Sequence, residues 1–357
     1  MVKKQKELFT LEANRRCVPI YEKASNIKQQ SDKFSRLYEN TKDIEKLMSR
    51  YRGNDTKTLK PVGIYFYPSV DLSPEGIINE VLTIHGRKTF WVLCSGGKDS
   101  ISVVHYIATN FPDQFAGVLH INTGVGIKLT TTWLEEYCKK MGWPFQMRSP
   151  PEGTYRDIVL KVGFPNAGLH TIVMRLLKLI TMRKFISETP ERKANHALIG
   201  GIRAFESDRR MVNAKSPISR DGSLFFVNPF LMKEDEWVYK YLLTNGLEKT
   251  PVHKYLGMSG ECMCGSYAGM GEREKIKFLD PELDAFLTQL TKDIQLYGTD
   301  RAKKYPVWGA GYASKEETEE IMKTMLSTQE IEKANAMEQT VCGVECGAGT
   351  LRGQENI

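Results

Sequence analysis

The chain has 357 residues, of which 41% are hydrophobic and 26% are charged. This length suffices for one large core of roughly 200 residues with smaller parts appended, and the composition excludes a disordered or membrane-built chain. The formal net charge of +7 lies entirely in residues 1–60, which carry 15 Lys and Arg against 8 Asp and Glu. Such asymmetry indicates an acidic partner, with nucleic acid the first candidate, or else the solvated face of a helix.

No apolar run approaches the ~20 residues of a transmembrane helix, and the basic residues near Met1 are not followed by the apolar run of a secretory signal. We therefore expect no membrane association and a cytoplasmic location. The seven cysteines would be reduced there, so clustered cysteines are expected to be metal ligands or catalytic thiolates rather than disulfides.

The chain begins with a predicted basic helical extension over residues 1–60. Between positions 20 and 52, apolar side chains recur at three- and four-residue steps among charged ones, which is typical of an amphipathic helix. Residues 61–68 should be extended. Ser73-Pro74-Glu75 begins a further helix, with a capping serine and a proline at the first helical position, and Gly86 ends it.

From Thr89 onward, predicted strands and helices alternate. Apolar runs predict five strands, at residues 89–93, 116–121, 145–148, 196–199 and 223–227. Amphipathic stretches predict helices at residues 100–110, 130–141, 169–187 and 234–244. This alternation predicts an α/β domain over residues 61–257, with a mostly parallel five-stranded sheet, helices on both faces and ligands at the carboxyl ends of the strands. Residues 258–357 form a third, cysteine-containing region with an acidic helix near residues 315–326.

The first of these strands runs directly into the loop Ser95-Gly96-Gly97-Lys98-Asp99-Ser100, and a helix follows. The glycines let backbone N–H groups approach a phosphate, the helix N-terminus adds partial positive charge, and the two serines add hydroxyl donors. Lys98 would supply a full charge to a polyphosphate, whereas Asp99 would bind Mg²⁺ or hold the loop in shape. The glycine spacing excludes a Walker A loop. A plain glycine-rich turn is the alternative.

This loop resembles the SGGKDS loop of the PP-loop ATP pyrophosphatases, which grip pyrophosphate and break ATP at the alpha phosphate. Two further segments resemble the phosphoadenylyl-sulfate (PAPS) reductase branch: Asn122-Thr123-Gly124 is similar to its "TG" turn, and the stretch from Gly201-Ile202-Arg203 to Arg210 is similar to its GxRxxESxxR signature. The resemblance covers about residues 89–265. It implies a Rossmann-like adenine-nucleotide alpha-hydrolase fold with the nucleotide across the strand ends.

The resemblance also implies a set of site residues. Those expected to be catalytic are Lys98, Asp99, Arg203 and Arg210. Those expected to bind nucleotide are Ser95, Gly96, Gly97, Lys98, Asp99, Ser100, Asn122, Thr123, Gly124, Gly201 and Arg203. The two arginines carry forked donors that suit a sulfate or phosphate, and surface salt bridges with Glu206 and Asp208 are their other interpretation. Asn122 replaces the aspartate common at its turn and lacks the charge that a metal would favour.

The remaining cysteines and histidines fall into two groups. Cys262-Met263-Cys264 and Cys342-Gly343-Val344-Glu345-Cys346 are two close pairs with glycines beside them. Four thiolates suggest one metal centre, with a [4Fe–4S] cluster expected and Zn²⁺ as the alternative. The DndC-type DNA phosphorothioation proteins resemble this arrangement, in that a cysteine cluster follows the nucleotide domain. The isolated residues are expected to pack or hydrogen-bond: Cys94, Cys138, His120, His170, His196 and His253.

Three functions remain open. The first is a sulfurtransferase that cleaves ATP with Mg²⁺ to AMP and pyrophosphate, with nucleic acid as a candidate acceptor and a sulfur-donor protein such as a cysteine desulfurase as partner. The second is a PAPS or APS reductase with Cys346 as nucleophile, because Glu345-Cys346-Gly347 resembles the ECG tail of those enzymes. The third is a nucleotide-sensing module without turnover. The loop favours the first function, because the reductase substrates lack β and γ phosphates.

Overall fold

The computed structural model describes residues 64–67, 69, 71–190, 193–206, 216–269 and 271–309. Several of the predicted features lie outside these residues: the basic extension over residues 1–60, the helix near residues 315–326, Arg210, Cys342 and Cys346.

A sheet forms the centre of the described residues, where seven strands lie in the order β1-β6-β7-β5-β2-β3-β4. The strands are β1 (Ile64–Tyr67), β2 (Thr89–Leu93), β3 (Phe115–Ile121), β4 (Phe145–Arg148), β5 (His196–Ile199), β6 (Ile218–Asp221) and β7 (Leu224–Val227). The run from β7 through β5, β2 and β3 to β4 is parallel throughout. These are the five strands that the sequence predicted, so the mostly parallel sheet is confirmed.

Two antiparallel strands extend the sheet beyond the prediction. β6 pairs with β7 through a tight turn at Gly222, whose φ of +58° lies in the left-handed region that favours glycine. β1 then pairs antiparallel with β6 at the edge. The predicted extended segment over residues 61–68 therefore contains a strand of the main sheet.

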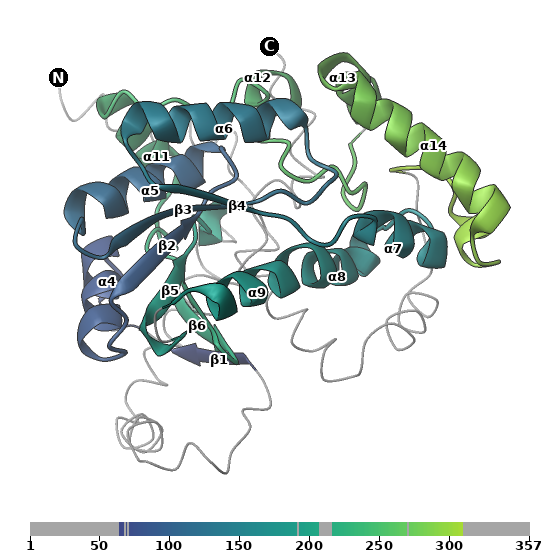
Figure 1. Ribbon diagram of the computed structural model, residues 1–357. Coiled ribbons are helices and arrows are strands. Elements are labelled where there is room, and N and C mark those ends of the chain that lie inside the picture. The colour runs from purple at the N-terminus through teal and green to yellow at the C-terminus, as the bar shows by residue number, and fades with distance from the viewer. Residues whose placement is uncertain are drawn as a thin grey trace, which may run out of the picture. The chain divides into compact units, whose positions relative to one another are not determined.

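Helices cover both faces of the sheet (Figure 1). The helices on one face are α4 (Pro74–Thr83), α5 (Lys98–Asn110), α6 (Lys128–Met141) and α11 (Asp235–Thr244). The other face is covered by α9 (Ile180–Glu188) and by a π-helical turn, η2 (Met174–Leu179). Successive side chains of β2 point to opposite faces of the sheet. Phe90 and Val92 therefore pack against the helices of the first face, and Trp91 and Leu93 pack against those of the second.

A further apolar cluster lies beyond the carboxyl end of the sheet. The helices that contribute to it are α7 (Thr154–Val162), α8 (His170–Val173), α12 (His253–Leu256), α13 (Glu272–Leu279) and α14 (Pro281–Tyr297). Val125, Ile127, Met263 and Cys264 belong to the same cluster. Packing therefore ties the first cysteine pair to segments from the α/β domain. The remaining short helical turns are η1 (Ala167–Leu169), η3 (Lys193–Asn195), η4 (Ala204–Glu206) and η5 (Ala302–Lys304).

Two helix predictions compare directly with the structure. Ser73 caps α4, because its hydroxyl accepts a hydrogen bond from the backbone N–H of Gly76 at 3.0 Å. The helix predicted at residues 169–187 is interrupted by η2, so it is not one regular α-helix. Among the described residues, no helix combines the length and the apolar character needed to cross a membrane.

Candidate functional site

The loop Ser95–Ser100 lies at the carboxyl end of β2 and leads into α5, whose N-cap is Gly97. The Ser100 hydroxyl folds the loop onto itself: it donates to the Gly97 carbonyl at 3.0 Å and lies 3.2 Å from the Ser95 hydroxyl. Gly96 has a φ of +86°, in the left-handed region, so a side chain there would be strained. The first N–H groups of an α-helix have no partner within the helix, and the N-terminus of α5 can therefore attract an anion.

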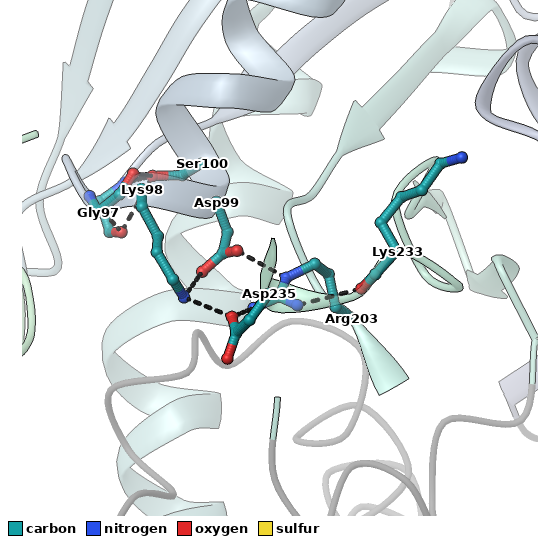
Figure 2. A network of polar contacts seen from close by, with 8 residues as sticks. Gly97, Lys98, Asp99, Ser100, Arg203, Lys233 and Asp235 are labelled. Atoms are coloured by element: carbon teal, nitrogen blue, oxygen red, sulfur yellow. Dashed lines mark hydrogen bonds and ion pairs between the residues drawn. The ribbon is translucent and has the colours of Figure 1, made fainter. Parts of the chain in front are cut away.

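Two cations and two carboxylates form a network beside this loop (Figure 2). The Lys98 ammonium lies 3.0 Å from an oxygen of Asp99 and 3.1 Å from an oxygen of Asp235. Arg203 reaches both carboxylates as well: its Nε donates to Asp99 at 2.6 Å and its Nη2 donates to Asp235 at 2.5 Å. Its Nη1 donates to the carbonyl of Lys233 at 3.0 Å. Each carboxylate thus bridges Lys98 and Arg203.

The network is mostly buried. The side chain of Arg203 is 0% exposed, that of Lys98 is 11% exposed and that of Asp99 is 6% exposed, whereas that of Asp235 is 58% exposed. Burial alone would lower the pKa of Lys98, but the charges of Asp99 and Asp235 raise it above its ordinary value. Burial would raise the pKa of Asp235, yet Arg203 and Lys98 lower it. Lys98, Arg203 and Asp235 therefore keep their charges near neutral pH.

This geometry refines what the sequence predicted for three residues. Asp99 contacts Lys98 and Arg203, which is the geometry of a residue that holds the loop in shape. Arg203 is buried inside the domain, so the surface salt bridge considered for it does not describe its environment. Lys98 lies at the loop as expected, but it also contributes to the packed interior.

Gly201 brings the end of β5 against the loop. A Cβ at this position would lie 3.0 Å from the carbonyl carbon of Asp99 and from the nitrogen of Ser100, which is tighter than ordinary packing permits. Glycine at 201 thus allows the segment that carries Arg203 to approach the loop.

The turn after β3 lies at the same edge of the sheet, because β2 and β3 are parallel neighbours. The Asn122 side chain accepts a hydrogen bond from the N–H of Gly124 at 3.0 Å, and the Thr123 hydroxyl donates to the carbonyl of Glu261 at 3.1 Å. Gly124 has a φ of +77°. A Cβ at Gly126 would lie only 2.3 Å from the Glu261 carbonyl oxygen. This turn therefore packs closely on the segment that carries the first cysteine pair.

Backbone hydrogen bonds fix Cys262 and Cys264 in this place. The N–H of Met263 donates to the carbonyl of Val125 at 2.7 Å, and the N–H of Ile127 donates to the carbonyl of Gly260 at 2.8 Å. The Cys262 thiol is hydrogen-bonded to Cys264, and this contact together with burial raises the pKa of Cys262 well above its ordinary value. The described part of the chain contains no group of three or more His, Cys, Asp and Glu side chains that could hold a metal. It supplies two of the four thiols predicted for the metal centre.

Sequence reasoning missed the residues that hold this cysteine segment. The Tyr155 hydroxyl donates to the carbonyl of Cys264 at 2.7 Å, and the Trp308 indole donates to the carbonyl of Met263 at 2.8 Å. Lys178, on η2, pairs with Glu261 at 3.1 Å, and both side chains are nearly buried. The one signal in the sequence is that Lys178 lies within an apolar run. Its partner, Glu261, is far away along the chain and could not be foreseen.

The isolated residues behave as predicted where the structure shows their contacts. His120 is buried, and its ring nitrogens lie 2.9 Å from the carbonyl oxygen of Cys94 and 3.0 Å from the hydroxyl of Thr131. Cys94 and Cys138 are buried in the core. His253 differs in lying near the loop: burial and the charges of Lys249 and Lys98 lower its pKa to about 4, so its ring is neutral at pH 7.

Comparisons with known proteins found a family match for the central part of the chain. Residues 89–257 match the family model of the phosphoadenosine phosphosulfate reductase domain. No curated protein matches the sequence. One similar solved structure is the PAPS reductase from Candida auris in a phosphate complex, with 13% identity over 52% of this chain and 85% of that chain and a TM-score of 0.38. Another is the U34-tRNA thiolase NcsA from Methanococcus maripaludis with its [4Fe–4S] cluster, with 13% identity over 64% of this chain and 85% of that chain and a TM-score of 0.33. The match of residues 89–257 to the phosphoadenosine phosphosulfate reductase domain agrees with the family that the motifs indicated.

Proposed function

We propose that this protein cleaves ATP at the alpha phosphate, with release of AMP and pyrophosphate, to activate an acceptor for sulfur transfer. The observation that supports the proposal best is the loop Ser95–Ser100, which is folded at the N-terminus of α5 with Lys98 beside it. A loop suited to pyrophosphate is of use only to a substrate that has β and γ phosphates. PAPS and APS lack them, whereas ATP has both.

The chemistry requires two displacements. An oxygen of the acceptor attacks the alpha phosphorus, the bond from that phosphorus to the bridging oxygen breaks, and pyrophosphate leaves with the electron pair. A sulfur nucleophile from the donor then displaces AMP from the acceptor. Lys98 and the N-terminus of α5 would stabilise the negative charge that develops on the leaving pyrophosphate.

The charged network fits a supporting role in this reaction. Arg203 and Asp99 would hold the loop in its folded shape, and Arg210 of the same signature is proposed as a further anion contact. Mg²⁺ would come with the ATP phosphates. Asp99 and Asp235 do not form an open site for it, because both already contact Lys98 and Arg203, and no step is assigned to a metal bound there.

The cysteine pairs are proposed to share one metal centre, most simply a [4Fe–4S] cluster, with Zn²⁺ as the alternative. Cys262 and Cys264 fit one half of such a site, since their thiols lie side by side and the flanking Gly260 and Gly265 have φ values of +70° and +86°. Cys342 and Cys346 would complete it. When bound, an iron–sulfur centre would supply a place to hold sulfur or pass an electron near the nucleotide.

The partners follow from the same proposal. The excess positive charge of residues 1–60 would bind a nucleic acid acceptor. A protein such as a cysteine desulfurase would deliver the sulfur. The reaction would take place in the cytoplasm. The match to the reductase domain supports a second candidate function, in which Cys346 attacks the sulfur of PAPS or APS. A nucleotide-sensing module without turnover is the third.

Two assays separate these functions. Pyrophosphate release from ATP and sulfite release from PAPS are measured for the wild type, for Lys98→Ala and for a control at the exposed Lys88, Lys88→Ala. The proposal expects pyrophosphate release that Lys98→Ala abolishes and Lys88→Ala preserves. Sulfite release without ATP turnover would replace it with the reductase function, and nucleotide binding without either product would favour the sensing module.

The cysteine centre has its own test. Iron, sulfide and zinc are measured after anaerobic purification of the wild type, of single Cys→Ser variants at 262, 264, 342 and 346, and of Cys17→Ser as a control. The shared centre is supported if all four Cys→Ser variants at 262, 264, 342 and 346 lose metal to the same extent while Cys17→Ser keeps it. If Cys346→Ser keeps its metal but loses activity, Cys346 is a nucleophile and the reductase function is favoured.

A further inference from the structure

Two aromatic side chains hydrogen-bond to consecutive carbonyl groups of the first cysteine pair. The Trp308 indole N–H donates to the carbonyl of Met263 at 2.8 Å, and the Tyr155 hydroxyl donates to the carbonyl of Cys264 at 2.7 Å. Both donors are buried, with Trp308 7% exposed and Tyr155 4% exposed. Tyr155 belongs to α7, whereas Trp308 follows η5. Two distant parts of the chain therefore hold the same short backbone segment.

Close packing fixes the Trp308 indole in the position where it donates. A Cβ at Gly265 would lie 2.9 Å from the indole Nε1 and 3.0 Å from its Cδ1, which is tighter than ordinary packing permits. The Arg273 guanidinium lies 5.8 Å from the centre of the Trp308 ring, and its Nε pairs with Asp284 at 2.6 Å. The indole thus lies between the backbone next to the cysteines and an arginine that is itself held in place.

The chain also returns to the cysteine pair at this point. Gly309 follows Trp308, and a Cβ at Gly309 would lie only 2.8 Å from the Cβ of Ala268. The chain that leads to Cys342 and Cys346 therefore leaves the described residues close to the first cysteine pair. This placement favours a site to which both pairs contribute.

Two thiols separated by one residue can bind the same metal ion only while the peptide units between them keep a suitable conformation. The Cys262 thiol is already hydrogen-bonded to Cys264, so the segment has brought the two sulfur atoms together. Groups that orient metal ligands without touching the metal typically change its affinity about 10–100-fold when they are removed. Buried Tyr and Trp side chains also hydrogen-bond for stability alone, so a test has to separate the two roles.

We propose that Tyr155 and Trp308 are positioning residues of the metal centre, which hold the backbone between Cys262 and Cys264 so that both thiols can bind one metal ion. This inference rests on the metal centre of the proposed function. It adds to that centre two residues that act through the backbone of the ligands. Trp308 lies outside the residues that match the reductase domain.

Anaerobic titration of the metal-free full chain with Co²⁺ tests this assignment, because thiolate ligands give bound Co²⁺ a charge-transfer absorption. Tyr155→Phe removes only a hydroxyl, and Trp308→Phe removes the N–H donor with part of the ring. Each should weaken Co²⁺ binding about tenfold or more and shift the charge-transfer band. Trp143→Phe is the matched control and should change neither, since Trp143 is 9% exposed and belongs to the apolar core beside the sheet.

A second background shows on which cysteines the two side chains act. Cys342 and Cys346 are both replaced by serine, and the titration is repeated with and without Tyr155→Phe. Binding should be weaker in this background, and Tyr155→Phe should weaken it further, because the hydroxyl holds the first pair. An unchanged affinity would contradict the proposed positioning of Cys262 and Cys264.

The outcomes separate this inference from the proposals on which it rests. If Tyr155→Phe and Trp308→Phe bind Co²⁺ as the wild type does, the positioning role is refuted while the metal centre stands. If Trp143→Phe weakens binding equally, or if the losses of affinity follow the melting temperatures of the metal-free variants, the two side chains serve stability alone and the inference is refuted. If the wild type neither contains metal nor binds Co²⁺, the metal centre and this inference fail together, whereas ATP cleavage is judged by its own assay.

Discussion

Replacement of Arg203 by methionine would test how the loop Ser95–Ser100 is held in its folded shape. Arg203 is fully buried and donates to Asp99, Asp235 and the carbonyl of Lys233. Methionine has a similar length and no charge, so Arg203→Met removes these contacts without a large change in volume. Asp99 would remain, with its side chain 6% exposed and Lys98 as its only charged contact among those described above.

The expected loss of stability follows from burial. Removal of one partner of a buried ion pair costs about 3–5 kcal/mol, because the other charge stays buried without it. The contact with Asp235 adds at most about 1 kcal/mol, since the Asp235 side chain is 58% exposed. We therefore expect Arg203→Met to lower the free energy of unfolding by about 3–5 kcal/mol in urea denaturation.

A matched control and a double variant make this measurement decisive. Arg156 pairs with Asp293 at 3.0 Å, but its side chain is 40% exposed, so Arg156→Met should cost no more than about 1 kcal/mol. Arg203→Met combined with Asp99→Asn should recover about 1 kcal/mol or more of the loss, because both buried charges are then gone. A loss within about 0.5 kcal/mol for Arg203→Met, the size typical of a surface substitution, would refute this account of the loop.

Three further outcomes are expected. His253 should titrate with a pKa of about 4 instead of its ordinary 6.5, and Lys249→Met should raise that value in an NMR titration. Because folding disfavours the protonated ring, the stability that neutral His253 provides is complete above pH 6.5 and is lost as the pH falls toward 4; His253→Gln should flatten the stability profile in this window. Gly126→Ala should destabilise the protein by about 1–3 kcal/mol, since its Cβ would lie 2.3 Å from the carbonyl oxygen of Glu261. Deletion of residues 1–60 should remove nucleic acid binding that weakens steeply with salt, as followed by fluorescence anisotropy; unchanged binding would show that the segment is not the interface.

The parallel strands were predictable because each one is a short apolar run that ends in a loop, as at residues 89–93 and 196–199. β1 was predicted only as an extended segment, and β6 was missed as a strand for a physical reason. The sequence of β6, Ile-Ser-Arg-Asp, has no apolar run, and its partners are fixed by tertiary pairing with β1 and β7. The π-helical turn was missed because a change of helical period within a continuous amphipathic pattern leaves little trace in the sequence.

The site was predictable only where its chemistry is local in the sequence. The loop could be identified because six adjacent residues carry both the glycines and the charges. Lys98 was expected to supply charge to a polyphosphate, and its contacts in the interior could not be foreseen: its side chain is 11% exposed and contacts Asp99 and Asp235. Asp235 and Lys249 reach the loop only through folding, so neither spacing nor composition marks them.

The most direct test of the proposed function is the fate of ATP labelled at its alpha phosphate. The anaerobically purified protein is incubated with labelled ATP, total nucleic acid as acceptor and sulfide as sulfur source, and the labelled products are separated. The proposal expects the label in AMP, with an equal amount of pyrophosphate and with sulfur incorporated into the acceptor. Label in ADP with release of inorganic phosphate, or unconsumed ATP beside sulfite release from PAPS, would contradict it.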